Sequence, residues 1–455
     1  MTDDLRTLAP ARPPGEPCVI DFEGASLRAY TGESLAVALF AAGIRTLGRS
    51  TKYHRPRGVF CLEGHCASCL LRVDGRPNVR ACLTPARSEL RCERQNAFPS
   101  AEVDFLAAAD WMFPRGMDHH TLMTGNPTAN RLFVKLVRQV GGSGTLPDVA
   151  PPPAPPPRAT LADVCIVGGG PAGLAAAAAV ARLAPWATVQ LFDEQAEPGG
   201  SWLAEPDGAP LASAAVTEAR RAGATVHTRA AALGFFPEDI EPAVAARADR
   251  SDWIAGTLVI ATPEGIVKVG ARRILYATGG ADQNVPFQDN DRPGVLSARA
   301  CGRLAFRHGI RPGQRVAIVG DAAFGERLAS GLAAAGVAVT RIDPLRERPV
   351  AAVGGARLRG LDVRDQTGDE RRVEADVIAT AATPAPASEL PRQHGARVRF
   401  DEAAGGFAVV IDAGFHTGIP GVFACGDVAG YQGPAAAALA GAAAGREIAQ
   451  TVRPA

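Results

Sequence analysis

The segment DVCIVGGGPAGLAAAAAVARL, residues 163–183, constrains the fold more than any other part of the chain. An apolar run leads directly into Gly168, Gly170 and Gly173, spaced as G-x-G-x-x-G, and an alanine-rich segment follows. In a strand–turn–helix unit the first glycine permits a tight turn, the second lets the backbone approach a pyrophosphate, and the third allows close packing of helix on strand. The pattern therefore predicts an α/β dinucleotide-binding domain with a parallel sheet.

The next apolar run, TVQLFDE, supplies a carboxylate for a ribose. Asp193 ends this run, at about the distance from the glycines at which an acidic residue binds the ribose hydroxyls of a dinucleotide. Glu194 is the alternative if the strand register is shifted by one residue.

Two later segments favour a flavin over a nicotinamide in this domain. RRILYATGG (272–280) and GIPGVFACGDVAG (418–430) resemble, in order and spacing, the downstream motifs of FAD oxidoreductases with two dinucleotide-binding domains. In that family the glycine–aspartate pair holds the ribityl chain of FAD. The predicted FAD-binding residues are Gly168, Gly170, Pro171, Ala172, Gly173, Asp193, Glu194, Gly200, Thr278, Gly279, Gly426 and Asp427.

A second glycine-containing turn lies at QRVAIVGDAAFGERLASGLAAAGVAVTRID, residues 314–343. It reads Gly320, Ala322, Gly325, with Asp343 ending the following apolar run. This segment resembles the nicotinamide-binding domain of the same family, but Ala322 carries a methyl group where the backbone should approach a pyrophosphate. Binding of NAD and a domain retained only for its fold are both open.

Four cysteines gather in a short stretch and predict an inorganic site. Cys61, Cys66, Cys69 and Cys82 follow the spacing C-x4-C-x2-C-x12-C, and the plant-type 2Fe-2S arrangement accounts for all four. A zinc site and a thioredoxin-like cysteine pair are the alternatives, although each explains the spacing less well. Cys92 is the one other cysteine that could substitute for a ligand.

Basic residues surround this stretch. Residues 49–80 contain seven Lys or Arg against two acidic residues, a local surplus of five positive charges. A cluster gains negative charge on reduction, so nearby cations should raise its reduction potential above the roughly −400 mV of plant-type ferredoxins. A solvated basic face is the alternative interpretation.

A proline-rich segment divides the predicted N-terminal domain from the predicted FAD-binding half. We predict a β-rich ferredoxin-like domain at 15–95, with a hairpin turn at Asp74-Gly75, a helical connector at 96–142 and a proline-rich linker at 143–160. The FAD-binding domain is expected in two parts, 161–298 and 385–455, around an NAD-binding-like domain at 299–384. The fold class is thus an α/β, Rossmann-like FAD oxidoreductase with two dinucleotide-binding domains, preceded by a small 2Fe-2S domain.

The segment GRSTKYHRPRGVFCLEGHCASCLLRVDGRPNVRACLTP (48–85), joined to this FAD half, resembles α subunits of heteromeric amine oxidoreductases. That family includes bacterial sarcosine oxidase and the opine, hydroxyproline and hydrogen cyanide-forming dehydrogenases. KYHRPRG (52–58) and DRPGVLSA (291–298) are the specific strings, and the chain looks like a ferredoxin-type subunit fused to an α subunit.

The resemblance implies that the chain passes electrons from a flavoprotein β subunit of the amine-oxidase type to an acceptor. Sarcosine, proline or hydroxyproline, and opines are the implied substrates, with further small subunits and an FMN at a subunit interface as additional expectations. KYHRPRG is the candidate contact to the partner or to a flavin phosphate. No His, Tyr or Arg group is identifiable as an amine site, so no catalytic residue is assigned.

Composition narrows the remaining function classes. The chain has 48 Lys and Arg against 47 Asp and Glu, which gives no overall case for nucleic acid or a membrane surface as a partner. Nine cysteines, an odd number, together with the lack of a signal sequence or apolar span, predict a cytoplasmic protein without a transmembrane segment. A self-sufficient NAD(P)H-dependent FAD/iron–sulfur reductase and a scaffold with empty cofactor sites are the alternatives.

Overall fold

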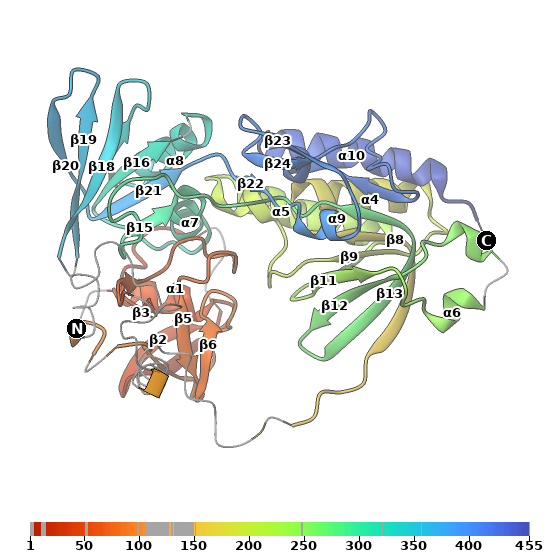
Figure 1. Cartoon of the computed structure of the whole chain (residues 1–455), viewed down its shortest axis with the longest axis horizontal. Helices are drawn as coiled ribbons and strands as arrows, with labels where there is room; N and C mark the ends of the chain where they lie inside the picture. Colours follow the sequence, from red (N-terminus) through yellow and green to blue (C-terminus); the bar gives the residue numbers. More distant parts are fainter. Residues whose placement is uncertain are drawn as a thin grey trace. The chain divides into compact units, whose positions relative to one another are not determined.

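The computed structural model describes residues 4–10, 15–50, 53–97, 100–105, 127–128, 131, 150, 152–246, 249–320, 322–355 and 357–454. The chain forms two compact units, each built from two separate stretches (Figure 1). Unit 1 contains Met1–Pro151 and Asn284–Ala381, and unit 2 contains Pro152–Gln283 and Ala382–Ala455. The chain therefore passes between the units three times.

Unit 2 is built on a seven-stranded sheet in the order β10-β9-β8-β13-β12-β11, with β25 paired to β13. Five strands pair in parallel with one another: β8, β9, β10, β13 and β25. The other two pair antiparallel, β12 with β13 and β11 with β12. The strands are β8 (Arg158–Val167), β9 (Val189–Phe192), β10 (Thr225–His227), β11 (Ala231–Phe236), β12 (Thr257–Thr262), β13 (Gly265–Tyr276) and β25 (Val422–Ala424).

Two helices from opposite ends of unit 2's sequence pack together over this sheet. In α4 (Pro171–Leu183) and α10 (Pro434–Thr451), small residues let the backbones approach closely (Figure 1). A Cβ on Gly441 would lie 2.0 Å from the Ala172 carbonyl oxygen, and one on Gly445 would lie 2.7 Å from that of Ala176. The contact therefore depends on glycine at these two positions.

The remaining elements of unit 2 are short except for α5. They are η2 (Gly200–Ala204), α5 (Gly208–Ala222), α6 (Pro242–Ala245), η3 (Arg250–Asp252), β14 (Gly280–Ala281), β22 (Ala385–Pro386), α9 (Glu389–Gln393), β23 (Val398–Asp401), β24 (Gly406–Val409) and η5 (Gly426–Ala429).

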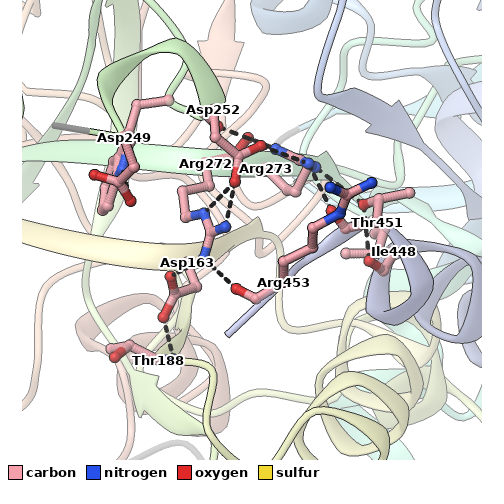
Figure 2. A network of polar contacts seen from close by, with 10 residues as sticks. Asp163, Thr188, Asp249, Asp252, Arg272, Arg273, Ile448, Thr451 and Arg453 are labelled. Atoms are coloured by element: carbon pink, nitrogen blue, oxygen red, sulfur yellow. Dashed lines mark hydrogen bonds and ion pairs between the residues drawn. The ribbon is translucent and has the colours of Figure 1, made fainter. Parts of the chain in front are cut away.

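A network of arginines fixes the C-terminal segment to the sheet (Figure 2). Arg272 of β13, only 4% exposed, bonds to Asp252, to Asp163 of β8 at 3.0 Å and to the Arg453 carbonyl at 2.8 Å. Arg273 donates to the same Asp252 carboxylate and to the carbonyl oxygen of Thr451. Because Arg272 is buried but its two carboxylate partners are partly exposed, removing one partner should destabilise unit 2 by less than the about 3–5 kcal/mol of a fully buried pair.

The N-terminal part of unit 1 contains a small sheet in the order β2-β1-β7-β5-β6 and the helix α1. The predicted hairpin is confirmed, since β5 and β6 pair antiparallel around Asp74 and Gly75, both at positive φ. The elements are β1 (Pro17–Phe22), β2 (Ala25–Tyr30), α1 (Leu35–Ala41), β3 (Gly48–Arg49), β4 (Pro56–Arg57), β5 (Leu70–Val73), β6 (Arg76–Arg80) and β7 (Arg91–Glu93).

The C-terminal part of unit 1 is a parallel sheet in the order β15-β21-β16-β17, joined to an antiparallel meander, β18-β19-β20. Its elements are β15 (Val295–Ser297), α7 (Ala298–Gly302), η4 (Arg303–Arg307), β16 (Arg315–Gly320), α8 (Ala322–Ala334), β17 (Ala338–Ile342), β18 (Glu347–Gly354), β19 (Leu358–Asp365), β20 (Glu370–Glu374) and β21 (Val377–Ala381).

The observed units differ from the expected domain bounds at several places; residues 382–384, for example, belong to unit 2 and not to the NAD-binding-like domain. Residues 284–298 belong to unit 1 and not to the FAD-binding half, because Val295–Ser297 pair with Ile378–Thr380. Residues 158–160, expected in the proline-rich linker, already form the start of β8 because they pair with 267–269. The predicted connector at 96–142 lies almost wholly outside the described residues.

No helix in the described part of the chain is both long enough and apolar enough to cross a membrane.

Candidate functional site

Four of the predicted segments meet at one edge of the unit 2 sheet. Val167 pairs with Phe192, and Tyr276 pairs with both Val167 and Ala424. These strands are parallel, so their carboxyl ends lie at the same edge. The residues that follow them are Gly168, Asp193, Thr278 and Gly426. Open α/β sheets bind ligands in this position, outside the carboxyl ends of their strands.

The three glycines of the first turn have distinct surroundings. Gly168 has φ +106°, and a Cβ on Gly173 would lie 1.9 Å from the Gly168 carbonyl oxygen, so neither position accepts a side chain. Gly170 has ordinary extended backbone, and the nearest atom to its Cβ position is 3.9 Å away. The second glycine thus faces open space, which is where a pyrophosphate would approach.

The N-terminus of α4 offers its backbone N–H groups to this space. Pro171 occupies the first turn, and Gly170 caps the helix without a side-chain hydrogen bond. Backbone N–H groups at a helix N-terminus bind phosphate oxygens. The arrangement therefore fits the pyrophosphate of FAD.

Asp193, and not Glu194, faces the glycine turn. Its buried carboxylate accepts hydrogen bonds from the Gly169 N–H at 2.5 Å and from the Gln195 N–H at 2.7 Å. Glu194 is exposed and contacts the Gln195 side chain. We infer that Asp193 is the ribose ligand, because its buried carboxylate is held against the glycine turn whereas Glu194 is exposed.

Gly200 and Thr278 lie next to the glycine turn. A Cβ on Gly200, which has φ +52°, would lie 2.9 Å from the Cα of Gly170. The Thr278 hydroxyl donates to the carbonyl oxygen of Ala387 at 2.7 Å, and Gly279 has φ +73°. Sequence patterns gave no signal for Ala387, whose contribution is a backbone carbonyl.

Gly426 and Asp427 lie against the start of α4. Gly426 has φ +77°, and a Cβ there would come within 2.8 Å of the Ala172 Cβ. Asp427 is buried at this edge of the sheet. The predicted FAD residues from both parts of unit 2 are thus brought together in one place, and their assignment as FAD ligands remains a prediction.

The four clustered cysteines of unit 1 form two pairs. Cys61 hydrogen bonds with Cys66, and Cys69 with Cys82. The bond from the Cys61 thiol lowers the pKa of Cys66 to about 6, and the bond from Cys82 likewise lowers the pKa of Cys69. A 2Fe-2S centre needs four thiolates, two for each iron, so two cysteine pairs fit it.

The alternatives to this cluster fit less well. A single zinc ion would need all four sulfurs around one point, whereas these cysteines hydrogen bond two and two. All nine cysteines are free thiols in this structure. Cys92 lies in β7, where its thiol contacts the Asp21 carbonyl oxygen and burial raises its pKa to about 12. It is therefore not a substitute ligand in this structure.

The cysteine loop has the backbone geometry that a cluster requires. Leu62, Gly64 and Ala67 all have positive φ, which turns the chain sharply between the cysteines. The Glu63 N–H donates to the Cys61 sulfur at 3.4 Å. Such N–H···S bonds stabilise thiolates and tune the reduction potential of a cluster.

The basic KYHRPRG loop contacts acidic residues of its own chain. Arg55 pairs with Asp289 and Asp291, and Arg57 pairs with Asp291 at 2.7 Å. Lys52 lies outside the described residues. The positive surplus counted from residues 49–80 is therefore partly neutralised by carboxylates from beyond residue 280, which a local charge count cannot include.

KYHRPRG and DRPGVLSA, the two strings that carry the family resemblance, meet within unit 1. Residues of both strings line a cavity of about 720 Å³. A structural role in joining the two parts of unit 1 thus explains both strings without a partner.

The second glycine turn is only partly described. Gly320 has φ +116°, which suits a tight turn after β16. Asp321 and the side chain of Ala322 lie outside the described residues, so the predicted crowding at Ala322 stays a prediction. Asp343 accepts a hydrogen bond from the Leu345 N–H at 2.9 Å and pairs with Arg346.

Two regions of the chain match known protein families. Residues 162–444, more than half of the chain, match the model of the pyridine nucleotide-disulphide oxidoreductases. The chain belongs to this family. Residues 15–97 match a 2Fe-2S iron–sulfur cluster binding domain. FAD and a 2Fe-2S cluster are therefore its cofactors, as the sequence predicted.

Three similar proteins extend this comparison. Sarcosine oxidase subunit alpha of Rhizobium meliloti (strain 1021) is 31% identical over 88% of this chain and 41% of its own length. Hydrogen cyanide synthase subunit HcnA of Pseudomonas aeruginosa is 38% identical over 18% of this chain and 80% of its own length. The structure of L-proline dehydrogenase from P. horikoshii has a TM-score of 0.69 at 21% identity, covering 97% of this chain and 74% of that one.

These matches bear on the chain's organisation. The chain spans less than half the length of the sarcosine oxidase relative. A stretch of 84 residues of this chain matches 80% of the length of the hydrogen cyanide synthase subunit. The proline dehydrogenase likeness covers nearly the whole chain and shows the fold.

Proposed function

We propose that this chain is the electron-transferring FAD/2Fe-2S subunit of a heteromeric amine or imino-acid dehydrogenase or oxidase. Electrons come from a partner flavoprotein subunit that oxidises sarcosine, proline, hydroxyproline or an opine. The similarity to sarcosine oxidase subunit alpha, together with a complete cysteine set in the same chain, carries this proposal.

The combination of cofactors supports this role. Oxidation of an amine to an imine releases two electrons, FAD accepts two, and a 2Fe-2S cluster passes them on one at a time. The residues of this chain would bind and orient FAD through the glycine turn and Asp193, and would hold the cluster through two cysteine pairs.

Disulfide chemistry is not supported in unit 2. Its two cysteines, Cys165 and Cys425, are buried in the sheet, and burial raises the pKa of each to about 12. Thiols with so high a pKa do not act as nucleophiles at neutral pH. The family's disulfide reaction therefore has no cysteine pair here.

We further propose a cytoplasmic location, which the nine free cysteines support, since a reducing compartment keeps thiols free. The partner is proposed to be a flavoprotein of the amine-oxidase type. Because Arg55 and Arg57 pair within the chain, the partner surface is proposed to lie outside this part of the KYHRPRG loop.

Co-expression with candidate flavoprotein subunits tests the proposal. The purified complex should oxidise one of the four amine substrates with an artificial dye as acceptor, and the isolated chain should not. A complex carrying Cys66→Ser in this chain should still reduce the partner's flavin but lose electron transfer through the cluster. Turnover of a secondary amine by the isolated chain, at the rate of the complex, would show that the substrate site lies here.

A further inference from the structure

The second dinucleotide-fold domain contacts the cysteine loop directly, within unit 1. The Ser297 N–H, at the end of β15, donates to the Phe60 carbonyl oxygen at 3.0 Å. Phe60 immediately precedes Cys61, the first of the four clustered cysteines. The backbone that begins the loop is therefore fixed to this domain.

An ion pair makes a second connection. The Glu63 carboxylate pairs with Arg303 and lies 3.8 Å from an Nη atom of Arg299. Arg299 and Arg303 are only 5% and 7% exposed, and the Glu63 side chain is 13% exposed. These charges interact in a poorly hydrated environment, where water and salt screen them little.

Glu63 links these arginines to the cysteines. It lies between Cys61 and Cys66 in sequence, and its N–H donates to the Cys61 sulfur at 3.4 Å. A displacement of the Glu63 side chain would therefore move a backbone donor to a cluster ligand. The arginines also place positive charge beside the loop that carries Cys61 and Cys66, and the cluster becomes more negative on reduction.

We propose that Arg299 and Arg303, held beside the cysteine loop by Glu63, raise the reduction potential of the 2Fe-2S cluster through their positive charge. The second dinucleotide-fold domain thereby serves as the electrostatic support of the cluster, a role independent of NAD binding. The inference rests on the proposed cysteine ligands and not on the identity of the amine substrate.

The charges fix the sign of each effect. Loss of a cation disfavours the more negative, reduced cluster, and loss of the Glu63 carboxylate favours it. Arg303→Gln should therefore lower the potential, Glu63→Gln should raise it, and the double variant should return close to the wild-type value. A purely structural role for the ion pair predicts that both single variants shift the potential in the same direction, or not at all.

Redox titration of the intact chain, followed by electron paramagnetic resonance, measures these shifts. For each single variant we expect about a tenfold change in the ratio of reduced to oxidised cluster at a fixed ambient potential, which is about 59 mV for one electron. Arg303→Lys keeps the charge and should stay within about threefold of wild type. Arg371→Gln removes an exposed ion pair with Glu347 on the meander of the same domain and should cause no shift.

Two results would overturn the proposal: shifts of the same sign in Arg303→Gln and Glu63→Gln, or unchanged potentials in both. If the Arg303→Gln protein fails to assemble the cluster, the potential is measured in Arg299→Gln instead, because the contact of Arg299 with Glu63 is longer. An unchanged potential in Arg299→Gln would then refute the proposal. Iron and sulfide analysis distinguishes failure of the cysteine ligand set from failure of the electrostatic proposal. Absence of iron from wild-type protein would refute the cysteine ligand set, whereas a loaded cluster with unshifted potentials would refute only this inference.

Discussion

Gly170 offers a way to remove FAD without disturbing the fold. Its backbone is extended, with φ −77° and ψ −173°, so any residue can adopt it. The nearest atom to a Cβ there is 3.9 Å away, an ordinary van der Waals distance. Gly170→Ala and Gly170→Val should therefore change the stability of the flavin-free protein by no more than about 0.5 kcal/mol.

The cost should appear in flavin binding. A methyl group at Gly170 occupies the space through which a pyrophosphate approaches, and overpacking of this kind costs about 1–3 kcal/mol. Since 1.4 kcal/mol is a factor of ten, the alanine variant should bind FAD roughly 5- to 150-fold more weakly. The two further methyl groups of valine should give protein that is purified without flavin.

Visible absorbance gives the flavin content per chain, and thermal unfolding of the flavin-free proteins gives their stability. Gly173→Ala is the contrasting variant, because its Cβ would lie 1.9 Å from a backbone oxygen and the fold itself should fail. Full FAD occupancy in Gly170→Val would refute the assignment of the glycine turn. Unfolding of flavin-free Gly170→Val would show that the open space at this position is not real.

Three further predictions address other parts of the chain. Anaerobically purified protein should contain about two irons and about two labile sulfides per chain. Cys92→Ser should leave the iron and sulfide contents unchanged. Protein that contains zinc but no sulfide would contradict the four-cysteine ligand set. NADH should reduce the flavin slowly or not at all, because Ala322 replaces a glycine, and rapid bleaching in stopped-flow experiments would instead favour the NAD(P)H-dependent reductase. Burial lowers the pKa of His394 from 6.5 to about 4, so between these pH values the unfolded chain binds one more proton than the folded chain. The melting temperature of unit 2 should therefore fall as the pH is lowered from 6.5 to about 4. His394→Gln should weaken this pH dependence, and an equally steep fall in the variant would show that other groups cause it.

Local patterns predicted those parts of the site that depend on neighbouring residues in sequence. The glycine turn, Asp193 and the cysteine spacing each occupy a short segment, and each segment must have its residue types in a fixed order to form a turn or hold a metal. The parallel register of β8, β13 and β25 then brings the separate FAD segments together, as their position after apolar strands indicated.

Contacts between distant segments could not be predicted in this way. Arg299 and Arg303 reach Glu63 across more than two hundred residues, and no periodicity or spacing marks them as cluster neighbours. The ion pairs of the basic loop, the candidate contact to a partner or to a flavin phosphate, could not be predicted for the same reason, since Asp289 and Asp291 are remote in sequence. The placement of residues 284–298 in unit 1 could not be predicted either, because the three-residue strand β15 is too short to show a pattern.

The two units alternate along the chain, and this order determines when each can be completed during synthesis. The glycine turn leaves the ribosome early, but β25, Gly426, Asp427 and α10 emerge only after the whole of the second part of unit 1. A nascent chain can therefore finish unit 1 around its cysteines while the flavin cradle is still open. A stop codon before residue 422 would spare every cysteine of the cluster and remove the strand and helix that close the FAD site.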